Sequence, residues 1–171
     1  MPYTAINARS EIQRPVSNTF ILMSVLAALF MNGLPWEGIW LMLRPDFVAV
    51  VLLYWCMHKP WRLGIGLSWA VGIFADVADA SLFGQHALEY SVLAFGGVVL
   101  NHRLQMFDLR QQTSHVFGIM VLAYTVYASV HWLMNGYVVW MYFLGCLTST
   151  LLWPPLCILF QAMRQTPVDR E

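Results

Sequence analysis

Two carboxylates and a histidine fall inside an apolar stretch of this chain that is long enough to cross a membrane. Asp76 and Asp79 lie near the middle of residues 60–88, and Gln85 and His86 follow close to its end. An ionised carboxylate at the centre of a bilayer costs about 2.5–3.5 kcal/mol on insertion scales. Acidic groups in such a stretch therefore need a polar partner or a function, and they are the first candidates for a site.

Their positions along the predicted helices place these groups near the outer face of a membrane. With Arg62 at the inner boundary, Asp76 lies about 21 Å and Asp79 about 26 Å along the helix. The next helix returns from the outer boundary, so Glu89 lies about 9 Å below it, on the same helical face as His86. The candidate polar cluster in the outer third therefore comprises Asp76, Asp79, Gln85, His86, Glu89 and Arg44.

Three interpretations of this cluster remain open. In the structural one, which we prefer, Asp79 and His86 cap helix ends, while a hydroxyl, an amide or Arg44 holds Asp76. In the second, the acids and His86 form a proton or ligand site, the usual functional hypothesis for ionisable groups in a membrane. In the third, the cluster contacts another subunit.

Small residues recur every four positions in the helix that carries the two acids. Gly64, Ser68 and Gly72 form this row. Small residues at this spacing let two helix backbones approach closely, which is a main device of helix association in membranes. The row predicts a packed face, either inside the protein, which we prefer, or against a partner.

No pattern typical of a catalytic, phosphate-binding or dinucleotide-binding site occurs in the sequence. The cysteines Cys56, Cys146 and Cys157 lie in apolar runs without metal-ligand spacing, and the formal net charge is zero. We therefore expect no enzyme activity, no cofactor, no metal and no nucleic-acid partner.

The composition requires a membrane environment. Hydrophobic residues make up 59% of the chain and charged residues only 11%, whereas soluble domains have about 25% charged residues. We predict an all-α polytopic integral membrane protein with a six-helix transmembrane domain over residues 18–162. A span needs about 20 mostly apolar residues, and the six candidates are 18–34, 39–57, 61–78, 83–100, 113–134 and 137–160. The second is the least regular, because Arg44, Pro45 and Asp46 interrupt it.

The basic residues predict the orientation. With six spans, eight of the nine Lys and Arg residues fall on one side, and Arg44 falls alone on the other. Because cytoplasmic loops carry an excess of Lys and Arg, residues 1–17 and 163–171 are predicted to be cytoplasmic, and the first helix is predicted to be retained.

A predicted cytoplasmic loop, residues 101–112, mixes apolar and basic side chains. It contains His102, Arg103 and Gln112. Such a segment suits the membrane interface, with apolar side chains dipping in and basic ones near anionic head groups. The alternative is a simple solvated loop.

The order of several short motifs over residues 44–112 resembles the family of the rod shape-determining protein MreD. The motifs are Arg44-Pro45-Asp46, Tyr54-Trp55, Pro60, Gly72, Asp76, Gly84-Gln85-His86-Ala87-Leu88, His102-Arg103-Leu104 and Gln112. Glu89 departs from this pattern, because the family usually has an apolar residue there.

The resemblance implies a small protein of the bacterial inner membrane with a fold similar to the substrate-binding (S) subunits of energy-coupling-factor transporters. Its implied role is a non-enzymatic scaffold of the cell-elongation complex that supports cell shape and lateral peptidoglycan synthesis. The implied direct partner is MreC, and the wider complex includes MreB, a RodA-type glycosyltransferase and a class B penicillin-binding transpeptidase.

A function of another class stays open beside this one. The chain could be a small substrate-binding or proton-coupled transport subunit that uses the region of Asp76, His86 and Glu89. Transport subunits of the similar fold usually carry an Ala-x-x-x-Ala pattern in the first helix, and the nearest match here is Ser24-x-x-x-Ala28.

Overall fold

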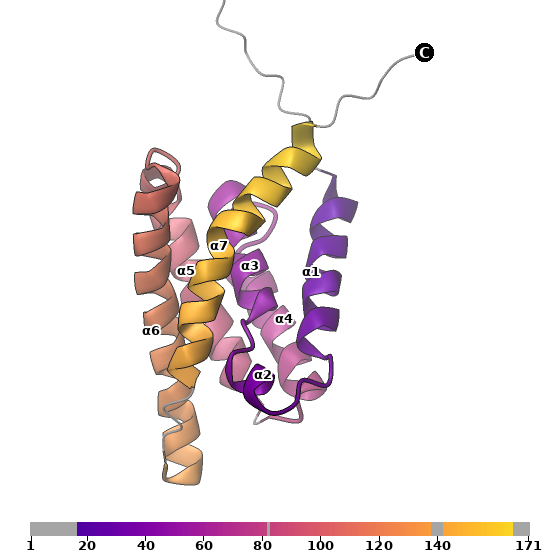
Figure 1. The fold of residues 1–171 in the computed structure, drawn as a ribbon, viewed down its shortest axis with the longest axis vertical. Coiled ribbons are helices and arrows are strands. Elements are labelled where there is room, and N and C mark those ends of the chain that lie inside the picture. The colour runs from indigo at the N-terminus through magenta and orange to yellow at the C-terminus, as the bar shows by residue number, and fades with distance from the viewer. Residues whose placement is uncertain (1–16, 82, 138–141, 166–171) are drawn as a thin grey trace, which may run out of the picture.

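The structure, a computed structural model, describes residues 17–81, 83–137 and 142–165. Every regular element in these ranges is an α-helix, which confirms the predicted all-α class (Figure 1). The helices are α1 (Asn18–Asn32), α2 (Ile39–Met42), α3 (Phe47–His58), α4 (Ile65–Ala78), α5 (Gln85–Leu104), α6 (Leu109–Asn135) and α7 (Tyr142–Gln165). The expected terminal segments, 1–17 and 163–171, lie almost entirely outside the described residues.

Apart from the short α2, the helices run in alternating directions (Figure 1). We call the end where α1 begins and α7 ends the terminal end; it also carries the connections 59–64 and 105–108. The opposite end, here called the turn end, carries α2 and the connection 79–84. The acids of the sequence-predicted cluster therefore lie towards the turn end.

Helix α3 lies at the centre of the bundle and packs against α1, α5 and α7. Its residues from Val48 to Met57 are all buried. The sequence explains this position, because the helix is apolar on every side, and such a helix is buried all round. Its 12 residues rise only about 18 Å.

The segment expected as one span over residues 39–57 forms two helices, α2 and α3, separated by residues 43–46. Pro45 lacks a backbone N–H, so it cannot continue a preceding helix. Asp46 then begins α3 as its N-cap, where its side chain accepts a hydrogen bond from the backbone N–H of Ala49 at 2.9 Å. The break therefore has a local cause.

Helices α4 and α5 pack very closely. A Cβ atom added to Gly72 would lie 2.4 Å from the Cα of Ala87, so only glycine fits there. Ser68 and Gly72 are both buried and belong to this inward side of α4. Gly64 lies outside the helix as its N-cap, where its carbonyl accepts from the backbone N–H and the hydroxyl of Ser68. The row expected to start at Gly64 thus starts at Ser68.

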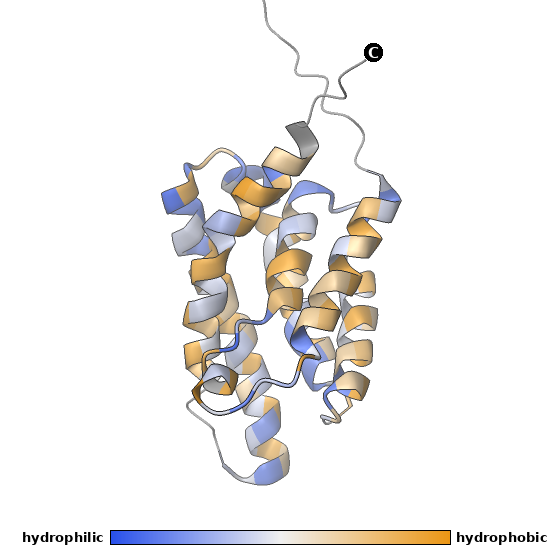
Figure 2. Ribbon diagram, turned by 45° about the vertical axis from the view of Figure 1, so that its right-hand side comes forward, coloured by the Kyte–Doolittle hydropathy of each residue, from blue (hydrophilic) through white to orange (hydrophobic). Residues whose placement is uncertain are grey.

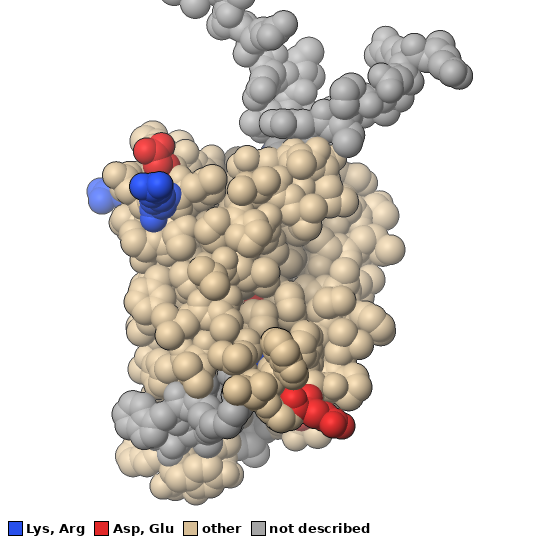
Figure 3. All heavy atoms as spheres, in the orientation of Figure 1, with Lys and Arg blue, Asp and Glu red and all other residues tan. Residues whose placement is uncertain are grey.

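The helices are composed largely of apolar residues (Figure 2), and many of these are exposed. Large exposed apolar side chains on α1 and α4 include Leu22, Leu26, Phe30, Leu67, Trp69 and Phe74. On the face shown in Figure 3, charged side chains gather at the two ends, and the band between them is almost entirely uncharged. Helix α6 and residues 143–163 of α7 are long and apolar enough to cross a membrane. These features indicate a helical membrane protein.

Candidate functional site

Asp76 lies near the end of α4 and caps the beginning of α5. Its Oδ2 accepts from the backbone N–H of Gly84 at 2.8 Å, and its Oδ1 accepts from the backbone N–H of His86 at 2.8 Å. The first N–H groups of a helix have no partner within that helix, and they carry the positive end of its dipole. Gly84 has a φ of 96°, a left-handed conformation that glycine adopts without strain. Asp76 is therefore the N-terminal cap of the neighbouring helix.

Two side chains complete the surroundings of Asp76. The Ser81 hydroxyl donates to Oδ1 at 3.0 Å, and Nδ1 of His86 lies 2.9 Å from the same oxygen. Ser81 Oγ and His86 Nδ1 are themselves 3.3 Å apart. Asp76 is 1% exposed, so this buried carboxylate has polar partners on both of its oxygens. Its partners are a hydroxyl, an imidazole and backbone amides.

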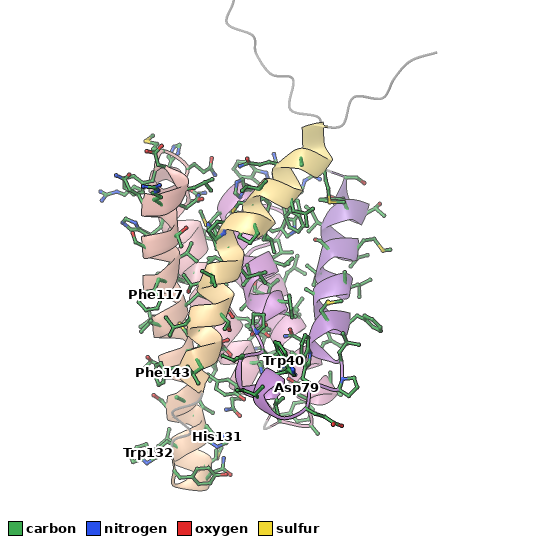
Figure 4. All side chains as sticks on the ribbon, in the orientation of Figure 1. Trp40, Asp79, Phe117, His131, Trp132 and Phe143 are labelled. Atoms are coloured by element: carbon green, nitrogen blue, oxygen red, sulfur yellow. The ribbon has the colours of Figure 1, made fainter. Side chains whose placement is uncertain are left out.

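Arg44 contacts Asp79 rather than Asp76. Its Nη2 lies 3.3 Å from Asp79 Oδ2, and its Nη1 donates to the carbonyl of Asn32 at 2.8 Å. Asp79 Oδ2 is also 3.9 Å from His86 Nε2. Arg44 thus connects Asn32, the last residue of α1, to Asp79, the residue that follows α4. Figure 4 shows Asp79 at the turn end.

Asp46 forms a second centre of hydrogen bonds. Its Oδ1 accepts from Asn32 Nδ2 at 2.9 Å, and its Oδ2 accepts from the Tyr90 hydroxyl at 2.9 Å. Its backbone N–H donates to Ser149 Oγ at 2.8 Å. The Asn32 carbonyl oxygen Oδ1 in turn accepts from the backbone N–H of Phe47 at 3.1 Å. One residue at the start of α3 therefore connects α1, α5 and α7.

Glu89 lies within the same region and differs from the two aspartates. It is 2% exposed, and its Oε1 is buried without a hydrogen-bond partner among the described residues. Gln85, one turn earlier on α5, donates to the carbonyl of Tyr127 at 3.4 Å. The structure therefore joins Asp76, Asp79, His86 and Arg44, and leaves Glu89 and Gln85 outside that set.

Comparisons with known proteins identify the family. The family described as rod shape-determining protein MreD matches residues 13–163. A curated relative, rod shape-determining protein MreD of Haemophilus influenzae, is 30% identical over 151 residues, which cover 85% of this chain and 91% of the relative. This chain belongs to the MreD family. No solved structure matches it. Membership of the MreD family assigns the chain a role in determining rod shape.

Within this MreD-family chain, the second centre was missed by sequence reasoning. Pro45 and Asp46 fit a helix start, and that part of the expectation needs only local sequence. The partners Asn32, Tyr90 and Ser149 come from three other helices. Nothing in their spacing marks them, because tertiary packing alone brings them to Asp46.

The residues predicted for the cytoplasmic loop of this MreD-family chain divide into two groups. His102 and Arg103 are exposed in the last turn of α5. Gln112 is a buried residue of α6, where its Oε1 accepts from Trp153 Nε1 at 3.3 Å. Only residues 105–108 connect the two helices, so the expected loop of 101–112 is mostly helical. Gln112 therefore has a packing role between α6 and α7.

The polar residues of the cluster connect different helices to one another. Among the described residues, no group of three or more His, Cys, Asp or Glu side chains could hold a metal ion. The carboxylate oxygens of Asp76 and Asp46 accept hydrogen bonds from N–H and O–H donors of other helices. In this MreD-family chain, the polar groups near the turn end fix the relative positions of α1, α3, α4, α5 and α7.

Proposed function

We propose that this protein is a non-enzymatic scaffold of the cell-elongation complex in the bacterial inner membrane, with MreC as its direct partner. Family membership supports a role in rod shape. One observation carries the scaffold proposal further: the buried Asp76 and the half-buried Asp46 accept hydrogen bonds that join helices. Their oxygens are engaged within the fold, so a contact with a partner falls to the outer faces of the helices.

We further propose six membrane crossings, similar to those of the S subunits of energy-coupling-factor transporters, with both termini in the cytoplasm. The alternating helix directions and the common end of α1 and α7 support this topology (Figure 1). The charges support the orientation, because Lys59, Arg62, Arg103 and Arg110 all lie at the terminal end. An excess of Lys and Arg is typical of the cytoplasmic side.

In this proposal the lipid-facing surfaces of α1 and α4 offer contacts to the single membrane helix of MreC. Both helices expose large apolar side chains over much of their length. The wider complex, which carries out lateral peptidoglycan synthesis, would also contain MreB, a RodA-type glycosyltransferase and a class B penicillin-binding transpeptidase.

Co-purification from detergent tests the proposal. The full-length protein carries an affinity tag and is expressed with MreC of the same organism. We expect MreC to be retained by the wild-type protein and by Gly66→Ala, whose site has no neighbour within 4 Å. We expect Trp69→Ala with Phe74→Ala, or Leu26→Ala with Phe30→Ala, to reduce retention. Failure of a monodisperse wild-type protein to retain MreC contradicts the proposal.

One observation favours a second function of a different class. The Oε1 of Glu89, buried and without a hydrogen-bond partner in the part of the chain that the structure describes, is an acceptor for a small ligand or a proton, as in a substrate-binding or proton-coupled transport subunit. Native mass spectrometry of the purified protein separates the two functions. A bound small molecule that is lost in Glu89→Gln supports transport, whereas retention of MreC without a small molecule supports the scaffold.

A further inference from the structure

The terminal end of the molecule has an unbalanced charge. Its described charged side chains are Lys59, Arg62, Arg103, Arg110 and Asp108. The described charged side chains towards the turn end are Glu37, Arg44, Asp46, Asp76, Asp79 and Glu89. The single arginine of the turn end is paired with Asp79, whereas one carboxylate faces four cations at the terminal end. The terminal end is therefore suited to an anionic partner.

The α5–α6 connection, which Arg103 and Arg110 flank, is hydrogen-bonded to the end of α3, close to the connection that carries Lys59 and Arg62. Gln105 Nε2 donates to the carbonyl of Met57 at 2.6 Å, which fixes the α5–α6 connection against the end of α3. Arg103 is two residues from Gln105, and Lys59 is two residues from Met57. Arg103 and Lys59 therefore lie near one contact between α3 and the α5–α6 connection, and Figure 3 shows basic side chains together with an acidic one at the upper left of the molecule.

Exposed apolar side chains stand among the cations. Trp61 is 83% exposed and lies between Lys59 and Arg62 in the sequence, and Met106 is 79% exposed and lies between Arg103 and Arg110. Side chains of this size are unfavourable in water. Tryptophan is enriched where the acyl chains of a bilayer meet its head groups. The mixture matches a surface that lies in the interface of a membrane.

We propose that the terminal end binds the head groups of anionic phospholipids. Lys59, Arg103 and Arg110 contact the phosphate groups, while Trp61 and Met106 enter between the upper parts of the acyl chains. A basic segment next to a membrane helix attracts anionic lipid with a strength that grows with each cation. An acidic protein would pair with the cations, but it would not account for the exposed apolar side chains among them.

Arg62 is kept unchanged in the test, because its guanidinium donates to Asn18 Oδ1 and so connects this end to α1. The charge variant is Arg103→Gln with Arg110→Gln, and the apolar variant is Trp61→Ala with Met106→Ala. Two matched controls are Gln111→Ala, an exposed residue beside Arg110, and Glu37→Gln, an exposed charge at the turn end. Gel filtration shows that each variant stays monodisperse.

The full-length protein in detergent is titrated with equal amounts of phosphatidylglycerol and phosphatidylcholine, and native mass spectrometry counts the retained lipids. We expect the wild-type protein to prefer phosphatidylglycerol, and the charge variant to lose at least about fivefold in that preference. The apolar variant should lose retention of both lipids, and both controls should behave like the wild type. Equal retention of the two lipids by the wild-type protein, or an unchanged preference in the charge variant, overturns the proposal. Complete displacement of the lipid by excess inorganic phosphate also overturns it, because it shows a site for free anions.

Discussion

At the scale of single residues, the buried Asp76 and the half-buried Asp46 use the same chemistry in different ways. Asp46 caps its own helix, and its free acceptors hold side chains of α1 and α5. Asp76 caps the next helix in the chain, α5, through the backbone of Gly84 and His86. A carboxylate inside an apolar bundle is stable when donors saturate its oxygens. Both residues are thus explained by the fold itself.

Asp76→Ala should destabilise the protein strongly, because it leaves the N–H groups of Gly84 and His86 buried without an acceptor. The expected loss in the free energy of unfolding is about 2 kcal/mol or more. Thermal unfolding in detergent, followed by near-ultraviolet circular dichroism, measures it. The control is Asp79→Asn, which removes a partly exposed contact with Arg44 and should cost less than about 1 kcal/mol. Equal losses in the two variants would show that the cap is unimportant.

Unlike Asp76→Ala, the substitution Glu89→Gln should leave the stability of the protein unchanged or raise it. Among the described residues no hydrogen-bond donor meets Glu89 Oε1, and burial without a donor disfavours a charged carboxylate, so a neutral amide at this position removes that cost. We expect the unfolding midpoint to stay equal or rise, whereas the equivalent change Asp76→Asn lowers it. A fall in the midpoint of Glu89→Gln comparable to that of Asp76→Asn would reveal a partner for this carboxylate.

At the scale of elements, the sequence predicts the helices better than it predicts their contacts. Length and apolar content identified the segments that contain α1, α4, α5, α6 and α7. The position of Asp76 near the end of its helix also agrees with the sequence, whereas its depth in the membrane stays a prediction. The donors to Asp76 were not predictable individually, because the turn at 79–84 places the Gly84 and His86 N–H groups through a left-handed glycine. Contacts between distant residues, such as Asn32 with Asp46, depend on the packing of the whole bundle.

The contact between α4 and α5 depends on one glycine. Gly72→Ala should cost about 1–3 kcal/mol in stability, because its Cβ would overlap backbone atoms of Ala87 and the helices would have to separate. Gly66→Ala on the same helix has no neighbour within 4 Å and should gain up to about 1 kcal/mol from helix propensity. Thermal unfolding of the two variants side by side tests this, and a loss in Gly66→Ala as large as in Gly72→Ala would refute the close approach.

At the scale of the whole molecule, the charges and the helix directions both support the membrane orientation proposed above. The terminal end carries most of the described cations, and the turn end carries most of the described carboxylates. Between them, the face shown in Figure 3 is almost free of charged side chains, and the helices expose many large apolar side chains. The molecule is thus polarised along the axis that we propose crosses the membrane.

Single cysteines test this orientation in intact cells. We expect Glu37→Cys, at the turn end, to react with a membrane-impermeant maleimide added outside the inner membrane. Gln111→Cys should react only after the membrane is opened, because it is exposed at the terminal end. The native cysteines Cys56, Cys146 and Cys157 are all buried, so background labelling should be low. The reverse pattern of labelling would contradict cytoplasmic termini.

The complete enclosure of α3 has a consequence for how the chain is inserted during synthesis. A helix of 12 residues is shorter than the about 20 that a membrane span needs, so α3 depends on its neighbours to hold it in place. Two of the helices that cover it, α5 and α7, leave the ribosome later than α3 does. We therefore expect α3 to become a stable part of the membrane only when α5 arrives to cover it.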